Sequence, residues 1–169
     1  LFVNPHAPHA PATPAPGEQS SLRAIGARGH IQLSPPRVAK GPEIDGKLDD
    51  EAWSHAAVLD SFTFSRPIEG LRDTLGTVAL VMYDDAHLYI AFRALDDPRG
   101  VQAPVTPRDA VWQGDWVGVS IDTYHDQQRS FFFCANPVGI QMDGIDQEGR
   151  DTDMAPDFQY TSKGRVTAA

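Results

Sequence analysis

Polar and apolar residues alternate over most of the chain beyond residue 76, which is the pattern of β-strands that turn one face toward a core. The predicted strands are Thr77–Tyr83, His87–Arg93, Trp116–Asp122, Ser130–Ala135, Gln141–Ile145 and Asp157–Ser162. Turns rich in Gly, Pro and Asp separate them, and no long helical pattern alternates with them. This arrangement predicts an all-β fold, an antiparallel β-sandwich of the jelly-roll or immunoglobulin-like kind.

The first two predicted strands flank the polar corner Asp84–Ala86, so together they predict a β-hairpin. Because side chains alternate between the two faces of a strand, we expect this hairpin to have one buried face. The residues expected on that face are Val78, Leu80, Met82, Leu88, Ile90 and Phe92.

The third and fourth predicted strands differ in how they would be covered. Alternation assigns Val117, Val119 and Ile121 to the core face of the third strand, and Trp116, Gly118, Ser120 and Asp122 to its other face. Ser130–Ala135 is almost continuously apolar, so we expect cover on both sides of it. Its Cys134, the one cysteine of the sequence, excludes an internal disulfide and is expected to be a buried thiol.

One short helix is predicted near residues 49–57. Asp49 can cap the amides that follow, and Asp50 and Glu51 suit the positive end of the helix dipole. Trp53 falls on the apolar side of this helix, so we expect its ring in the core.

Residues 1–28 have a different composition from the remainder of the chain. Leu1–Val3 resembles the end of a signal-peptide core, and the prolines that recur up to Pro16 favour an extended backbone. We therefore expect a signal remnant and a disordered linker over 1–28, followed by one domain over 29–169. A low-complexity tail of a cytosolic protein is the alternative for this segment.

Charge and hydropathy exclude two classes of partner. The chain has 14 Lys and Arg against 23 Asp and Glu, a formal net charge of -9, whereas nucleic-acid binding needs clustered basic surface. No apolar run approaches the roughly 18 residues of a membrane-spanning helix. We expect neither a nucleic-acid partner nor a membrane span in this segment.

Residues 108–116 combine two tryptophans with an arginine, an amide and two carboxylates. A flat indole can cover the apolar face of a pyranose while polar groups bond its hydroxyls, so this mixture predicts a sugar site. The candidate residues are Trp112 and Trp116 for stacking, with Arg108, Asp109, Gln113 and Asp115 around the rim. The alternative is structural: Trp116 as ordinary sheet packing and Trp112 as a loop plug.

Acidic turns suggest a structural ion but no catalytic centre. Calcium binds oxygen ligands from loops of this kind, and Asp96, Asp97 and Asp122 are the predicted ligands, although no segment has the spacing of an EF-hand. The six histidines never reach the spacing of a zinc site. No carboxylate stands out as a glycosidase acid, so we expect a binding module and not an enzyme.

Three ordered motifs, residues 42–53, 83–93 and 115–123, resemble the carbohydrate-binding module family 9-like domain. The continuation 133–144 is similar to the version found at the N-terminus of large bacterial outer-membrane proteins that carry a predicted C-terminal β-barrel. The similarity spans about Ser34 to Thr167. It implies an exported β-sandwich, located in the periplasm, at the outer membrane or on the cell surface.

Two departures from the family pattern bear on the site. Xylanase-linked members usually have a glutamate where this chain has Gly118, and the family domain ends with a further Trp-containing strand beyond the point where this chain stops at Ala169. We therefore expect a domain truncated at its C-terminus. The resemblance implies that stacked aromatic rings grip the sugar, with polar side chains around them.

Two functions follow as hypotheses, both within a larger protein whose C-terminal domain would be a hydrolase or a barrel. The first is a non-catalytic module that binds a poly- or oligosaccharide in carbohydrate catabolism. The alternative is a structural or plug module of an outer-membrane β-barrel protein that binds no sugar. Haem binding, a third option, would need axial ligands such as Met82, whose strand position instead favours the core.

Overall fold

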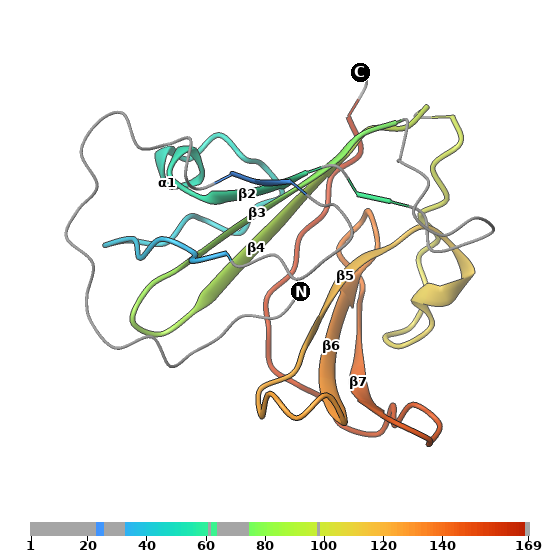
Figure 1. The fold of residues 1–169 in the computed structure, drawn as a ribbon. Coiled ribbons are helices and arrows are strands. Elements are labelled where there is room, and N and C mark those ends of the chain that lie inside the picture. The colour runs from blue at the N-terminus through green and yellow to red at the C-terminus, as the bar shows by residue number, and fades with distance from the viewer. Residues whose placement is uncertain (1–22, 26–32, 61, 64–74, 98, 168–169) are drawn as a thin grey trace. The chain divides into compact units, whose positions relative to one another are not determined.

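A computed structural model describes residues 23–25, 33–60, 62–63, 75–97 and 99–167 of the 169-residue chain. Its elements are β1 (Arg23–Ile25), α1 (Glu51–Ser54), β2 (Ala57–Asp60), β3 (Thr77–Tyr83), β4 (Leu88–Ala94), the 3₁₀ helix η2 (Val111–Gln113), β5 (Val117–Ile121), β6 (Arg129–Ala135) and β7 (Gln141–Gln147). The strands form two sheets, in the orders β1-β2-β3-β4 and β5-β6-β7 (Figure 1). The predicted all-β class with antiparallel strands and one short α-helix is confirmed, and the strands fall into two sheets as a sandwich requires.

The first sheet belongs to one of two compact units into which the chain divides, and the second sheet belongs to the other. Pairing is antiparallel except between β1 and β2, which are parallel. β1 falls within the predicted linker, whereas residues 1–22 and 26–28 lie outside the described part of the chain. Among the described residues, no helix combines the length and apolar character needed to cross a membrane.

The hairpin of β3 and β4 is buried on both faces, so the prediction of one buried face is wrong. Val81 pairs with Ile90, and Val81 packs with Leu59 in one core cluster. Met82 points to the opposite face, where it packs with Trp53 in a second cluster. Residues paired across two strands share a face of the sheet, and Ile90 is paired with Val81. The residues that alternation assigned to one face therefore lie on two, with Ile90 on the face opposite to Leu80 and Met82. Every position of β3 between its termini is apolar, which suits a strand covered on both sides.

The short helix is present but smaller than predicted. It spans Glu51–Ser54, its N-cap is Asp50 and not Asp49, and the Asp50 side chain makes no capping hydrogen bond. Residues 57–60 form β2 instead of continuing the helix. Trp53 is 6% exposed, which confirms its predicted core position.

Asp84 closes the corner between β3 and β4. Its carboxylate accepts hydrogen bonds from the Tyr89 hydroxyl and from the backbone amides of Ala86 and His87. The Tyr89 bond, followed by the amide bonds, lowers the pKa of Asp84 to about 2. The predicted polar corner is thus a turn organised by one aspartate side chain.

The second sheet, β5-β6-β7, also has two covered faces. On one face Phe132, Cys134 and Met142 form a buried cluster with Val111 of η2. On the other face the rings of Phe131 and Phe133 contact residues of the segment that follows β7. The predicted two-sided cover of β6 is therefore confirmed. The predicted burial of Cys134 is confirmed as well, and this burial raises the pKa of the Cys134 thiol to about 11.

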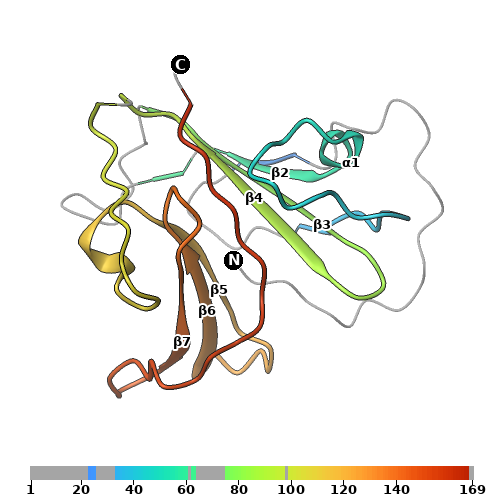
Figure 2. The ribbon, with the colours of Figure 1, turned by 180° about the vertical axis from the view of Figure 1, so that it is seen from behind.

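The segment after β7 is not the strand predicted over Asp157–Ser162. It passes along the sheet as irregular chain (red in Figure 2). Its Phe158 ring lies edge-on to Phe131, with centroids 5.5 Å apart, and the Tyr160 ring lies edge-on to Phe133 at 5.5 Å. The aromatic alternation that suggested a strand instead places rings on one face of the sheet. Beyond an isolated backbone bridge between Ile145 and Asp153, side chains hold residues 157–162 in place of a backbone ladder.

Candidate functional site

The tryptophan-bearing segment 108–116 crosses one face of the β5-β6-β7 sheet. It starts at β7, where the Asp109 amide donates to the Gln141 carbonyl oxygen at 3.0 Å, and it ends where Trp116 leads into β5. Val111 in its middle is 1% exposed and packs against Phe132 and other residues of the buried cluster. We call the sheet face that carries Gly118, Ser120, Phe132 and Cys134 the tryptophan face.

Trp112 and Trp116 lie together and are exposed. Their ring centroids are 5.2 Å apart and their planes stand at 87° to each other. Trp112 is 55% exposed and Trp116 44% exposed, although the Trp112 ring also approaches the buried Phe132 ring at 6.4 Å. The two indoles therefore form a braced, right-angled corner whose rings still present surface to solvent.

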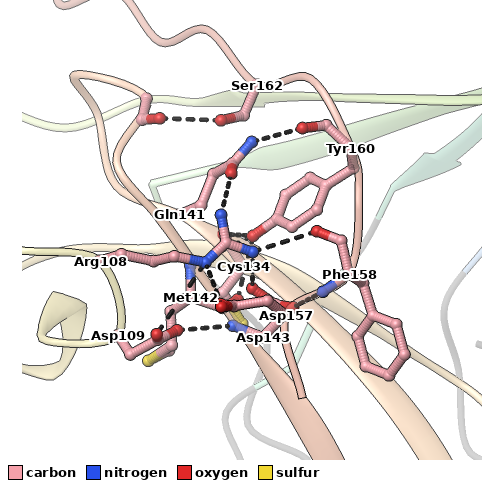
Figure 3. A network of polar contacts seen from close by, with 11 residues as sticks. Arg108, Asp109, Cys134, Gln141, Met142, Asp143, Asp157, Phe158, Tyr160 and Ser162 are labelled. Carbon is pink, nitrogen blue, oxygen red and sulfur yellow. Dashed lines mark hydrogen bonds and ion pairs between the residues drawn. The ribbon is translucent and has the colours of Figure 1, made fainter. Parts of the chain in front are cut away.

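Arg108 lies in a polar network at the start of this segment (Figure 3). Its Nη1 donates to the Gln141 side chain and its Nη2 to the Asp143 carboxylate. Nη2 also donates to the Phe158 carbonyl oxygen at 3.1 Å, and Nε forms an ion pair with Asp157 Oδ1 at 3.0 Å. The guanidinium is thus half-buried and engaged by groups of the protein itself.

Asp143 is the centre of that network. Its side chain is fully buried on β7, where one oxygen accepts from Arg108 and the other from the Phe158 amide. Its own amide donates to Asp109 Oδ1 at 3.3 Å. Asp143 therefore joins the tryptophan segment, β7 and the segment after β7, and Asp109 takes a left-handed conformation, with φ 66°, at this junction.

Electrostatics keep Arg108 charged in these surroundings. Burial alone would lower the pKa of Arg108, but the fields of Asp143, Tyr160 and Asp157 outweigh it and raise the pKa above its ordinary value. Burial raises the pKa of the neighbouring Tyr160 to about 12. Arg108 therefore stays protonated and the Tyr160 phenol stays neutral throughout the neutral range.

The far end of the tryptophan segment has its own anchor. The Asp115 amide donates to the Gln102 carbonyl oxygen, and the Asp115 carboxylate accepts from the Gln102 amide, each at 2.8 Å. Gln113, between the two tryptophans, is exposed. Of the six predicted sugar-site residues, the structure thus gathers Trp112, Gln113 and Trp116 at the surface, whereas Arg108, Asp109 and Asp115 anchor the ends of the segment.

Gly118 lies on the tryptophan face, two residues along the strand from Trp116. A Cβ atom at this position would lie 2.5 Å from Cys134 Sγ and 2.8 Å from the Phe133 carbonyl oxygen. Because the second contact is with backbone, the strands would have to move apart to admit any side chain. The close approach of β5 to β6 therefore leaves room for glycine at this position and not for the glutamate that the resemblance to xylanase-linked members implied.

Sequence reasoning missed Asp143 as an organising residue. The available signal was an aspartate inside a predicted strand, flanked by Met142 and Gly144, because a carboxylate buried there needs a cation. Alternation could not name Arg108 as that cation, since the two residues are 35 positions apart.

The predicted calcium ligands do not gather into a site. Across the described ranges, no group of three or more His, Cys, Asp or Glu side chains is placed to hold a metal ion. The Asp122 carboxylate accepts the amides of Tyr124 and Gln127, and Asp97 pairs with Arg99. These aspartates organise turns, and calcium binding stays a prediction from the sequence.

Exposed indole rings braced on a β-sheet are typical of binding domains whose ligands stack on aromatic side chains. The chain belongs to the carbohydrate family 9 binding domain-like family, whose sequence model matches residues 44–152. This match confirms the resemblance seen in the three motifs and indicates carbohydrate binding. Comparison with curated proteins and with solved structures gave no match.

Proposed function

We propose that this chain is a non-catalytic carbohydrate-binding module that holds its ligand at Trp112 and Trp116. The observation that supports it is the adjacency and exposure of the two indoles on a face whose underlying residues are buried. Had both rings been sealed in the core, no aromatic surface would be left to meet a sugar. Family membership supports the same ligand class.

The geometry of the indole corner defines how it would bind. With their planes at 87°, the two rings cannot both lie flat on one pyranose. One ring stacks on the apolar C–H face of a sugar, and the other borders the sugar's edge. Gln113 is exposed beside them and can donate to and accept from hydroxyls. Two aromatic contacts with a few hydrated hydrogen bonds correspond to roughly 4 to 6 kcal/mol, a Kd of about 0.05 to 1 mM.

Arg108, Asp109 and Asp115 take a supporting role in this proposal. Their polar groups bind the protein itself, so they fix the segment that presents the indoles. Preorganisation of this kind lowers the entropic cost of binding. Weak intrinsic affinity is then compensated by attachment to a second domain or to neighbouring copies, because multivalency multiplies affinity.

We further propose that the module belongs to a larger exported protein in carbohydrate catabolism. Its location would be the periplasm, the outer membrane or the cell surface, and its C-terminal neighbour a hydrolase or a β-barrel. The Pro-rich N-terminal composition and the motif similarity over residues 133–144 support this context. Calcium would be a structural addition and takes no part in the proposed contact.

The test is titration of tryptophan fluorescence with mono- and oligosaccharides of gluco, xylo and manno type. Saturable quenching is expected for the native chain. Trp112→Ala and Trp116→Ala should each weaken binding at least about tenfold, because each removes a stacking or bordering surface worth about 1.4 kcal/mol or more.

Tyr124→Ala is the matched control. Tyr124 is 66% exposed, and the Arg129 guanidinium lies over its ring. Because side chains alternate along β6, Arg129 projects from the face opposite to the one that carries Ser130 and Phe132. Removal of the Tyr124 ring should leave affinity unchanged. The second candidate function is a structural module, and the lack of room for a side chain at Gly118 favours it. If no saccharide of the panel quenched the fluorescence of the native chain, the structural function would be supported and sugar binding contradicted.

A further inference from the structure

The tryptophan face continues past the indoles into a polar end. Ser120 of β5 lies directly opposite Phe132, the residue whose ring approaches Trp112. Ser130 of β6, two residues from Phe132, is on the same face, and its hydroxyl lies 2.7 Å from the Ser120 hydroxyl. Phe132 thus lies between the aromatic corner and a pair of hydroxyls.

The hydroxyl pair suits sugar recognition by its chemistry. A serine hydroxyl has one donor and two acceptor lone pairs, so the bond that Ser120 donates to Ser130 leaves two acceptor lone pairs on Ser120 and one donor and one acceptor lone pair on Ser130. Ser120 is exposed and Ser130 half-buried, and their contact fixes the distance between the two oxygens. Two neighbouring hydroxyls of a sugar ring present the same spacing and the same mixture of donors and acceptors.

The same end of the face carries a second bonded pair. Asp146 of β7 lies opposite Ser130, and its Oδ1 accepts from the Thr152 hydroxyl at 2.6 Å. Both side chains are exposed. Polar groups from three adjacent strands and the following turn therefore form one continuous surface beside Phe132.

The polar surface around Ser120 and Ser130 lies farther from the two indoles than the length of one sugar ring. Trp116 and Ser120 are four residues apart along extended chain, about 13 Å at roughly 3.3 Å per residue. A single pyranose on the indoles cannot span that distance, whereas a chain of linked rings can.

We propose that Ser120 and Ser130 form a second sugar subsite, so that the ligand is an oligosaccharide whose further ring lies over this hydroxyl pair. The proposal rests on the sugar-binding function proposed for Trp112 and Trp116. It names the ligand as a chain of linked pyranoses, one ring at the indoles and one at the serines, with Phe132 below the path between them.

The test compares affinity for one, two, three and four linked rings of the same saccharide series, measured by calorimetry and tryptophan quenching. The native chain should bind the longer members at least about fivefold more tightly than the monosaccharide. Ser120→Ala and Ser130→Ala should each reduce affinity for the longer members roughly three- to tenfold, as the loss of about one net hydrogen bond predicts, and leave monosaccharide affinity unchanged.

Thr161→Ala, which removes an exposed hydroxyl from the segment after β7, is the control and should change neither affinity. Unfolding midpoints of all variants, measured by circular dichroism, establish that the serine variants are folded. Equal affinity for short and long saccharides, or serine variants that bind long saccharides like the native chain, would overturn the second subsite while leaving the indole site standing. Absence of binding to every saccharide would instead overturn the function on which the subsite rests.

Discussion

At the scale of single residues, the candidate site depends on a carboxylate that would not contact the ligand. Asp143 is fully buried and binds Arg108 and the Phe158 amide through its two oxygens. Breaking a buried ion pair from one side leaves the other charge without its partner, which costs more than the pair contributes when intact. Asp143 therefore stabilises both the tryptophan segment and the segment after β7.

Asp143→Asn should lower the free energy of unfolding by about 2 to 4 kcal/mol, because the Arg108 guanidinium loses its buried counter-charge. Urea denaturation followed by circular dichroism measures this. Asp151→Asn, at an exposed turn position, is the matched control and should change stability by less than about 0.5 kcal/mol. Equal effects of the two substitutions would contradict the central role of Asp143.

At the scale of elements, the segment after β7 shows how side chains can replace a strand ladder. The Tyr160 hydroxyl donates to backbone carbonyl oxygens of Cys134 and Met142 and accepts from the Met142 amide. The Gln141 side chain donates to the Tyr160 carbonyl oxygen. One phenol thus ties this segment to both β6 and β7, and it does so in its neutral form.

Tyr160→Phe should destabilise the fold by about 1 kcal/mol near neutral pH, because the Cys134 and Met142 carbonyl oxygens lose the one hydroxyl proton that they share. The native pKa of Tyr160 is raised to about 12 from an ordinary 10, so the folded state prefers the protonated phenol. Its contribution is therefore complete below pH 10 and is lost as the pH rises from about 10 to 12.

The measurement is the difference in unfolding free energy between the native chain and Tyr160→Phe across that alkaline range. The difference should shrink as pH rises, and Tyr124→Phe, at an exposed ring, should give no such trend. A difference that stays constant up to pH 12 would show that the phenol hydrogen bonds carry no protonation-linked stability.

At the scale of the whole molecule, net charge restricts the class of saccharide. The chain carries a formal charge of -9. Asp115, within the tryptophan segment, and Asp146, at the polar end of the face, are both exposed. A uronate oligomer would bring further negative charge to this surface, whereas a neutral oligomer would not. The charge therefore favours neutral saccharides.

Binding of a neutral oligosaccharide should be independent of ionic strength, and an oligogalacturonate should bind more weakly, by several-fold or more at low salt. Because the screening length falls to about 10 Å at 0.1 M salt, this difference should narrow as salt is added. Titrations at low and moderate salt with both ligands measure it. Tighter uronate binding at low salt would contradict an acidic ligand surface.

Local patterns predicted much of the fold because alternation is a property of short stretches of chain. The limits of β3 follow directly from it, and β5 to β7 differ from their predicted bounds by one or two residues. Where the pattern was ambiguous, it failed. Residues 57–60, of which the first three are apolar, form a strand that the short helix signal concealed, and the alternating aromatics near residue 158 form no strand. Whether these residues form a strand depends on which distant segments their backbone and side chains contact, and a local pattern does not contain that information.

For the candidate site, the sequence by itself determined the chemistry: two indoles, an amide and several charged groups within nine residues of chain. Only the tertiary structure decided which of those groups reach solvent, because burial and ion pairing depend on residues far away in sequence. Val111 packs into the buried cluster beneath the segment, whereas Trp112 and Trp116 on either side of Gln113 stay exposed. Arg108 is half-buried and is held by Asp143, a partner 35 residues away that no local pattern could select.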